Sequence, residues 1–318
     1  MKAVVYTRYG PPEVLQLQEA AQPVPQDNQL LVRVHATTVN RSDYATIRAK
    51  PFFARVITGL FRPKKQIPGT SFSGVVRQAG KNVSAFQTGD RVFGFDDQGA
   101  CAQAEYLAIS EDKAIALPDG ITHEQAAASI EGAHYACNFI NKVPLAAGQQ
   151  VLVNGATGAI GSAAVQLLKY FGAQVSAVCG TEGIEAVKAM GADRVIDYRK
   201  EDFTRDSGQF HYVFDTVGKS SFFKCRRLLL PGGVYISSDL GYLAQNIFLP
   251  LITPVFGGRK TVSPIPVNIG QTLQLIRKLL EAGKFRPLID RTYTLDQIDE
   301  AYRYAGSGQK KGNVVVTI

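Results

Sequence analysis

The stretch "VLVNGATGAIGSAAVQLLK", residues 151–169, decides how the rest of the chain is interpreted. It runs from an apolar strand pattern through three glycines spaced three residues apart into an amphipathic helical pattern. Small residues at such a turn let the backbone approach a pyrophosphate, and the amides at the start of the helix donate hydrogen bonds to it. The stretch therefore predicts dinucleotide binding; the alternative is a tight turn without a ligand. The residues expected to contact the cofactor here are Gly155, Thr157, Gly158, Ala159 and Ile160.

The segments on either side of this stretch predict an α/β fold with two lobes. Residues 1–120 contain short β segments, and residues 121–262 alternate strands with helices, which is typical of a parallel, doubly wound sheet. Thr122 is the expected N-cap of the first helix, and "FFKCRRLLLPGG", residues 222–233, is expected to be helical. Residues 263–318 are expected to return to the first lobe.

The end of the second strand, "VCGTEG", lies where a Rossmann unit distinguishes NAD from NADP. An acidic residue there hydrogen-bonds the ribose hydroxyls, whereas a basic residue neutralises the 2′-phosphate. The strand end itself has neither. Thr181 and Tyr198 are therefore the expected ribose contacts, and Glu182 is expected to repel a phosphate.

Composition indicates a soluble globular protein of the cytoplasm. Of the 318 residues, 45% are hydrophobic and 19% are charged. No N-terminal signal is visible, and the most apolar stretch, residues 246–256, is much shorter than the about 20 apolar residues of a membrane span. The four cysteines are far apart, which indicates free thiols. The net charge of +8 comes from short basic clusters such as Lys310–Lys311, expected to be solvated, so neither a nucleic-acid nor a membrane partner is expected.

Further motifs give the chain a resemblance to a known family. In chain order they are "MKAVVYTRYGPPEVLQL", "VNRSDY", "IPGTSFSG", "TGDRVFGF", "AEYLAI", "GADRVIDYRKEDF", "VFDTVG" and "KKGNVVVTI". With these motifs the chain resembles the medium-chain dehydrogenase/reductases, in the zinc-independent branch of quinone oxidoreductases and enone reductases. The resemblance implies a GroES-like catalytic domain (residues 1–120 and 263–318), a Rossmann domain (residues 121–262) and a homodimer. It also implies Lys311 as a cofactor contact.

Comparison with the zinc-dependent members of this family implies that the chain binds no metal. In "VNRSDY", expected to be a loop tied down by Asp43, Asn40 stands where those relatives carry a cysteine. Thr70 and Ser71 stand where they carry a His-Glu pair, and Cys101 is the only cysteine of the segment that corresponds to their structural zinc lobe. A catalytic zinc needs about three N, S or O ligands. An amide and two hydroxyls are poor ligands, so the loop is expected to face the substrate.

The resemblance implies reduction of a quinone, enone or enal by hydride from NADP(H), slightly preferred over NAD(H). Glu182 and Gly183 depart from that preference, because relatives that use NADPH carry Lys or Arg there. Asn40 and Tyr44 are the candidates for holding the acceptor oxygen or the nicotinamide ribose, with structural roles as the alternative. His134 of "EGAHYA" is a candidate second proton donor, or else a hydrogen-bonded helix histidine.

Residues 48–69 are long for the family. Phe53, Val56, Ile57 and Leu60 recur at helical spacing with basic residues between them, which predicts a flap over the substrate. The alternatives are packing in the core or a dimer interface, and a helix on a membrane surface.

Two rival functions are tested by other features of the sequence. A short-chain dehydrogenase would need Tyr-x-x-x-Lys, and no tyrosine of the chain has a lysine four positions later. A dinucleotide-binding redox sensor or RNA-binding protein with little turnover would bind NADPH or RNA without acceptor-dependent oxidation.

Overall fold

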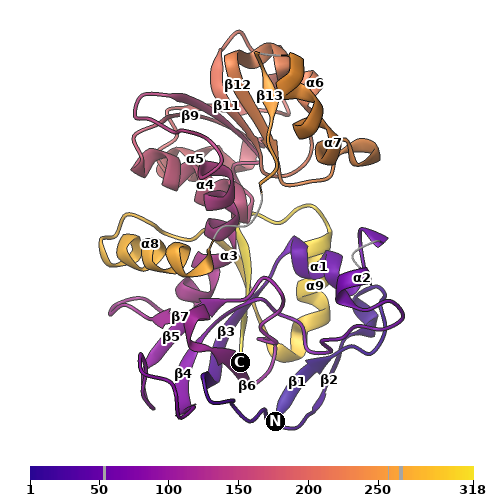
Figure 1. The fold of residues 1–318 in the computed structure, drawn as a ribbon, viewed down its shortest axis with the longest axis vertical. Coiled ribbons are helices and arrows are strands. Elements are labelled where there is room, and N and C mark those ends of the chain that lie inside the picture. The colour runs from indigo at the N-terminus through magenta and orange to yellow at the C-terminus, as the bar shows by residue number, and fades with distance from the viewer. Residues whose placement is uncertain (53–54, 257, 265–267) are drawn as a thin grey trace. The chain divides into compact units, whose positions relative to one another are not determined.

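The computed structural model of the chain describes residues 1–52, 55–256, 258–264 and 268–318. They form two compact units, the first made of Met1–Glu131 and Ile269–Ile318 and the second of Gly132–Asn268 (Figure 1). Helix α3 (His123–Ile140) begins in the first unit and ends in the second. Its N-terminus confirms Thr122 as the cap, because the Thr122 hydroxyl accepts a hydrogen bond from Gln125 N at 3.2 Å.

The first unit is built on a sheet with the strand order β14-β15-β3-β4-β5-β7, in which β6 pairs with the first half of β3. The strands are β3 (Gln29–Val39), β4 (Ser71–Ala79), β5 (Arg91–Phe95), β6 (Tyr106–Ser110), β7 (Ala114–Ala116), β14 (Ile289–Thr294) and β15 (Asn313–Thr317). A separate hairpin joins β1 (Lys2–Val5) to β2 (Gln16–Glu19). Most residues of β3 are buried, as expected for a central strand.

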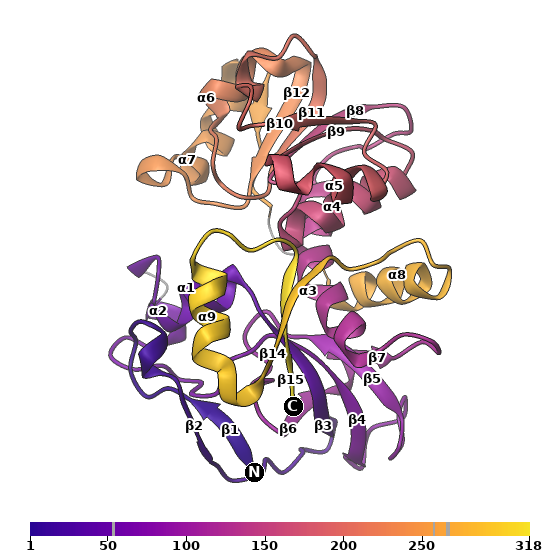
Figure 2. The same cartoon turned by 180° about the vertical axis from the view of Figure 1, so that it is seen from behind.

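The register of this sheet brings three segments of the chain to the end of β3. Antiparallel pairing places Val314 of β15 opposite Val39, and Phe72 of β4 opposite Thr37. The residues just before β15 and at the start of β4 therefore lie beside the last residues of β3 (Figure 2). Polar residues that are far apart in sequence meet at this edge of the sheet.

Two helices pack together next to this edge. Helix α1 (Arg41–Ile47) follows β3 directly, and α9 (Ile298–Gly306), which precedes β15, lies beside it (Figures 1 and 2). Ile47 of α1 and Tyr302 of α9 belong to one buried apolar cluster. A Cβ on Gly306 would lie 2.5 Å from the Tyr44 ring, so this close approach requires glycine. The remaining helical segments of the unit are α2 (Arg55–Thr58), α8 (Ile269–Glu281), η1 (Pro12–Val14), η3 (Glu111–Lys113) and η9 (Leu295–Gln297).

The second unit is a parallel sheet with the strand order β10-β9-β8-β11-β12-β13. The strands are β8 (Gln150–Asn154), β9 (Gln174–Cys179), β10 (Arg194–Asp197), β11 (Phe210–Asp215), β12 (Leu229–Ser237) and β13 (Lys260–Thr261). The helical segments are α4 (Ala159–Tyr170), α5 (Ile184–Ala189), α6 (Phe222–Cys225), α7 (Gln245–Ile252), η4 (Thr181–Gly183), η5 (Phe203–Arg205), η6 (Arg226–Leu228), η7 (Tyr242–Ala244) and η8 (Thr253–Phe256). The strand order reverses between β8 and β11, which is where doubly wound sheets bind ligands. The expected α/β architecture is confirmed.

Two local predictions need correction. "FFKCRRLLLPGG" is helical only as far as Leu228, and buried Leu229 begins β12 because its tertiary pairing with Phe210 of β11 overrides the helical pattern. In the segment 48–69, the helical spacing that runs from Phe53 to Leu60 corresponds to a helix only in α2, and Val56 is exposed. Phe53 and the side chain of Ile57 lie outside the described residues, so the predicted flap stays a prediction.

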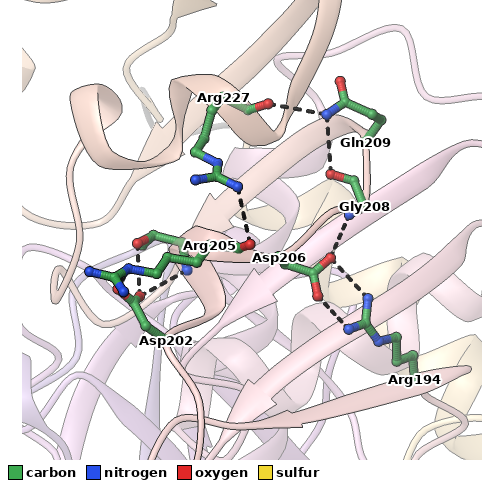
Figure 3. Close-up of polar contacts among 8 residues, drawn as sticks. Arg194, Asp202, Arg205, Asp206, Gly208, Gln209 and Arg227 are labelled. Carbon is green, nitrogen blue, oxygen red and sulfur yellow. Dashed lines mark hydrogen bonds and ion pairs between the residues drawn. The ribbon is translucent and has the colours of Figure 1, made fainter.

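Polar contacts hold in place the crossing segment, residues 198–209, which connects the edge strand β10 to β11. Both amino groups of Arg194, at the start of β10, donate to the Asp206 carboxylate, one of them at 3.0 Å (Figure 3). Asp206 also accepts from Gly208 N, and Arg227 donates to Arg205 O at 3.1 Å. These contacts lie where parallel strands begin, away from the carboxyl edge where a ligand is expected.

Candidate functional site

The glycine stretch forms a cradle at the carboxyl edge of the parallel sheet. Gly155 follows β8 with a φ of +83°, a conformation that favours glycine. A Cβ on Gly161 would lie 2.1 Å from the carbonyl oxygen of Gly155, so α4 can begin this close to the strand only with glycine. The hydrogen bond from Ser162 N to Gly158 O opens α4, and the amides just before Ser162 are the donors that the helix start offers. The cradle fits a dinucleotide pyrophosphate.

Gly158 and Thr157 have different tasks in this cradle. Gly158 has an ordinary φ of −73°, and a Cβ there would lie 3.3 Å from the carbonyl oxygen of Gly155, so a small side chain requires only a slight shift of the turn. The main effect of having no side chain at Gly158 is therefore that a ligand can come close to the start of α4. Thr157 packs against Gly183, where a Cβ would lie 2.3 Å from the Thr157 methyl group. A side chain at position 183 would therefore have to displace the Thr157 methyl group.

Polar side chains gather at the end of β9, around Gly180. A Cβ on Gly180 would lie 3.2 Å from the Tyr198 hydroxyl and from Glu182 Oε2, and 3.3 Å from Arg199 Nε. Arg199 Nη2 pairs with Glu182 Oε1 at 2.7 Å. The Thr181 hydroxyl donates to Asp197 Oδ2 at 2.6 Å and, as the largest cause, lowers the pKa of that carboxyl. A positive charge therefore does reach this strand end, from the loop after β10.

A row of polar residues ends the neighbouring strands of the same sheet edge. The register aligns Asn154 of β8, Asp215 of β11 and Ser237 of β12. Buried Asp215 accepts hydrogen bonds from Asn154 Nδ2 at 2.9 Å and from the Tyr235 hydroxyl at 3.0 Å, so it joins the three strands. A cavity of about 180 Å³ opens beyond β12 and β13. Its lining includes Tyr235, Ser237, Asp239, Asn246, Thr261 and Ser263.

In the first unit, the segment "NRSDY" is the start of a helix and not the expected loop. Asn40 is the N-cap of α1, and its backbone amide donates to Asp43 Oδ2 at 2.8 Å, which confirms that Asp43 ties the segment down. Asn followed three residues later by Asp is itself a helix-start signal. Burial, followed by the neighbouring Glu131, raises the pKa of the Asp43 carboxyl well above its usual value. The cap holds Asn40 in one orientation at the end of β3.

The Asn40 amide lies between an acid and an amine. Its Nδ2 donates to Glu131 Oε2 at 2.7 Å, and its Oδ1 accepts from Lys310 Nζ at 2.9 Å. Glu131 comes from α3, and Lys310 from the segment just before β15. Lys310 also donates to the carbonyl oxygen of Gly312. The expectation that Lys310 is a solvated surface charge is therefore wrong, because the register of β15 draws its amine into the cluster.

Hydroxyl groups complete this polar cluster. Ser42 and Thr70 donate to Glu131, the latter at 3.3 Å. Thr38 and Ser71 share a hydrogen bond of 2.6 Å. The cluster thus gathers Asn40, Thr70 and Ser71, which contribute an amide and two hydroxyl groups. Within the described residues, no group of three or more His, Cys, Asp or Glu side chains could hold a metal ion.

The other predicted site residues are dispersed. The Tyr44 hydroxyl accepts from Arg48 Nη1 at 2.7 Å, and its ring packs on α9. Lys311 is partly buried, and its backbone amide donates to Asp290 Oδ2 at 2.6 Å. His134 is fully buried on α3 in the second unit, where its ring meets Tyr135 edge-on at 5.8 Å. The structure therefore gathers the predicted cradle residues, places Asn40 and Tyr44 together at the start of α1, and places His134 on α3.

Sequence reasoning missed Glu131, Lys310 and Arg199. Glu131 lies in an Ala-rich helical stretch, and its spacing from "VNRSDY" carries no signal. Lys310 and Arg199 were visible only as members of short basic runs. Their partners come from segments distant in sequence, which only the strand register brings together.

The chain is similar to characterised families along its length. A family model described as "Alcohol dehydrogenase GroES-like domain" matches residues 26–133, and one described as "Zinc-binding dehydrogenase" matches residues 190–316. A 2-methylene-furan-3-one reductase of Solanum lycopersicum is 31% identical, over 99% of this chain and 79% of that protein. A quinone oxidoreductase of Sus scrofa is 29% identical, over 95% of this chain and 93% of that protein.

A solved structure agrees with these relatives. The quinone oxidoreductase from Coxiella burnetii superposes with a TM-score of 0.89 at 27% identity, over 100% of this chain and 99% of that one. In the described parts of the chain, none of the helices combines the length and the apolar character that a membrane crossing requires.

Proposed function

Because the chain belongs to the medium-chain dehydrogenase/reductase superfamily, in its zinc-independent quinone oxidoreductase branch, we propose that it reduces quinones or α,β-unsaturated carbonyls with NAD(P)H. The observation that carries the proposal is the glycine cradle between β8 and α4, whose shape suits a dinucleotide pyrophosphate and leaves no room for side chains at Gly155 and Gly161. When bound, the reduced nicotinamide supplies a hydride. The protein must then stabilise negative charge on the acceptor oxygen and deliver a proton.

Within this proposal the two units contribute different groups. The amides at the start of α4 hold the pyrophosphate, and Thr181 and Tyr198 lie near the strand end that faces the ribose in Rossmann units. The polar cluster around Asn40 supplies hydrogen-bond donors and an ammonium for an oxygen that gains charge. Tyr44, His134 and Lys311 stay candidates for these roles.

NADP(H) is the preferred cofactor in this proposal. Arg199 and the Tyr198 hydroxyl lie beside Gly180, where a 2′-phosphate is bound in Rossmann units. Glu182 faces Arg199 at 2.7 Å, so its charge is neutralised by this pair instead of repelling the phosphate outright. A guanidinium suits a phosphate because its N–H groups bind two oxygens at once.

Replacing Arg199 and Glu182 tests the cofactor preference. Arg199→Ala should weaken NADPH binding by about 10–100-fold and leave NADH binding nearly unchanged, because a hydrogen bond to a charged group contributes about 1.5–3 kcal/mol. Glu182→Gln should shift the ratio of dissociation constants towards NADPH, because it frees Arg199. Fluorescence titration of each cofactor measures both, and Arg205→Ala, an exposed arginine of the same unit, is the control. An unchanged ratio in both variants contradicts the preference.

Turnover tests the function itself. Oxidation of NADPH and of NADH is followed after chelator dialysis against a panel of quinones, enones and simple aldehydes. Acceptor-dependent oxidation with quinones or enones is the expected result. Tight cofactor binding without turnover on any acceptor would instead favour the redox-sensor alternative. A homodimer in the cytoplasm, without a membrane or nucleic-acid partner, completes the proposal, and sedimentation of the purified protein measures the dimer.

A further inference from the structure

Lys310 brings a positive charge into a cluster whose other ionisable members are acids. Its ammonium donates to Asn40 Oδ1 at 2.9 Å and to the Gly312 carbonyl oxygen. An ammonium has three N–H donors, and these two hydrogen bonds are the ones it makes within the described part of the chain. One N–H therefore remains for a ligand oxygen.

We propose that Lys310 is the proton donor of the reduction, an inference that rests on the function proposed above. An enone that gains a hydride, with its electron pair, at the β-carbon shifts its π electrons to the carbonyl oxygen. The Nζ–H bond of Lys310 breaks as an O–H bond forms at that oxygen, which leaves an enol and a neutral amine. The enol tautomerises to the saturated carbonyl, and water returns a proton to Nζ. The turnover thus consumes one hydride and one proton.

The surroundings of Lys310 suit it to proton transfer near neutral pH. Burial lowers the pKa of Lys310 to about 8, against the attraction of Glu131, Asp290 and Asp43, while Arg41 adds to the lowering. An amine with this pKa is mostly protonated at pH 7 and gives up its proton readily. An exposed lysine, with a pKa of about 10.4, holds its proton too strongly for the same task.

Asn40 is the positioning residue for this ammonium. Glu131 accepts from Nδ2 at 2.7 Å, which turns Oδ1 towards Lys310. The α1 cap fixes the backbone of Asn40 through Asp43. The start of α1, helix α3 and the segment before β15 therefore together fix the position of Lys310 Nζ.

The activity test compares two substitutions across pH 6–10. In the wild type, kcat/KM for an enone at saturating cofactor should fall tenfold per pH unit above about pH 8, as Lys310 loses its proton. Lys310→Met should lower kcat/KM by about 10²–10⁴-fold at pH 7 and abolish this alkaline fall. Lys310→Arg keeps the charge but holds its proton, so it should also be slow and lack the fall. Lys278→Met, an exposed lysine of α8, should keep the wild-type profile.

A second readout needs neither turnover nor a variant. Trace acetic anhydride acetylates only neutral amines, so peptide mass spectrometry at each pH gives a titration curve for every lysine. Lys310 should titrate near pH 8 in the wild-type protein, about two pH units below the value of about 10.4 for a free lysine side chain. A curve for Lys310 with a midpoint near that of a free lysine side chain would overturn the proposal, whatever the variants do.

The outcomes separate this inference from the function that it assumes. If none of the quinones or enones tested supports oxidation of NAD(P)H by the wild type, the proposed function is wrong. If the wild type turns over but Lys310→Met stays within about threefold of it, or keeps the alkaline fall, only the role of Lys310 is wrong. Cofactor titration and thermal unfolding show that each variant is folded, and the acetylation curve decides the matter if Lys310→Met is not.

Discussion

At Asn40, the backbone amide, Nδ2 and Oδ1 each contact a different ionisable side chain, and Nδ2 also donates to Thr38 at 3.3 Å and to Asn313 at 3.4 Å. The backbone amide donates to Asp43, Nδ2 to Glu131, and Oδ1 accepts from Lys310. Only one rotation of the amide satisfies both an acid and an ammonium, because the amide carries its donor and its acceptor on opposite sides. The positions of the Glu131 carboxylate and the Lys310 ammonium are therefore coupled through this one side chain.

Asn40→Ala should lower kcat/KM by about 10–100-fold, or 1.4–2.7 kcal/mol of transition-state stabilisation. The substitution also removes an acceptor that favours the charged form of Lys310, so the pKa of Lys310 should fall and the alkaline limb should move to lower pH. Steady-state kinetics over pH 6–10 measure both effects. The exposed Asn28→Ala is the control. Unchanged kinetics, or a lower rate with the limb in its wild-type place, would remove Asn40 from this role.

At the scale of the element, different glycines of the βα unit around the glycine cradle serve the packing of the fold and the binding of the cofactor. Gly161 is needed for the packing of α4 on Gly155, whereas a Cβ on Gly158 would make a milder contact of 3.3 Å in an ordinary backbone conformation. Strand, turn and helix were all predictable here, because each depends on neighbouring residues. The pairing of Arg199 with Glu182 was not, because it joins two loops that follow different strands.

The two glycines should respond differently to alanine. Gly161→Ala should lower the free energy of unfolding by about 1–3 kcal/mol, because its Cβ would overlap the Gly155 carbonyl oxygen. Gly158→Ala should leave stability within about 0.5 kcal/mol of the wild type and weaken cofactor binding at least tenfold, because a methyl group would face the pyrophosphate. Urea unfolding measures the stability of both variants, and cofactor titration measures their affinity for the cofactor. Normal cofactor affinity in Gly158→Ala would place the dinucleotide elsewhere.

The contact between Arg194 and Asp206 should make the second unit sensitive to acid. The hydrogen bonds from Arg194 hold the pKa of Asp206 below its usual value. A carboxyl with a lowered pKa stabilises the fold above its unfolded pKa, and this contribution is lost as pH falls towards the folded pKa. Asp206→Asn should therefore cost about 1–2 kcal/mol at pH 7 and much less at pH 3.

Urea unfolding at the two pH values measures this difference. Asp202→Asn is a suitable comparison, because its partner Arg205 is largely exposed. An equal loss at both pH values would show that the shape of the Asp206 side chain, and not its charge, holds the crossing segment in place.

At the scale of the whole molecule, the fold class and the family were predictable, whereas most of the polar cluster was not. The motifs and the alternation of strands with helices are local patterns, and both survive in the structure. The polar cluster draws on β3, α3 and the segment before β15, and the hydrogen-bonded pair of Asn40 and Lys310 is separated by 270 positions. A single sequence does not reveal such pairs. In "VNRSDY" the error is of another kind, because the local signal was present. Its Asn-x-x-Asp spacing indicates a helix start, but the many polar residues favoured the interpretation as a loop.

The donor set of the cluster predicts that the whole protein works without zinc. Asn40, Thr70 and Ser71 offer an amide and hydroxyls, which bind Zn²⁺ poorly, and the ammonium of Lys310 would repel a cation at the same place. Elemental analysis after gentle purification should therefore find no stoichiometric zinc, and turnover should survive chelator dialysis. One tightly held zinc per chain, with activity that is lost on chelation and restored by zinc, would show that the Lewis acid of the reaction is a metal. Lys310 would then be a structural neighbour of that metal and not the source of the proton.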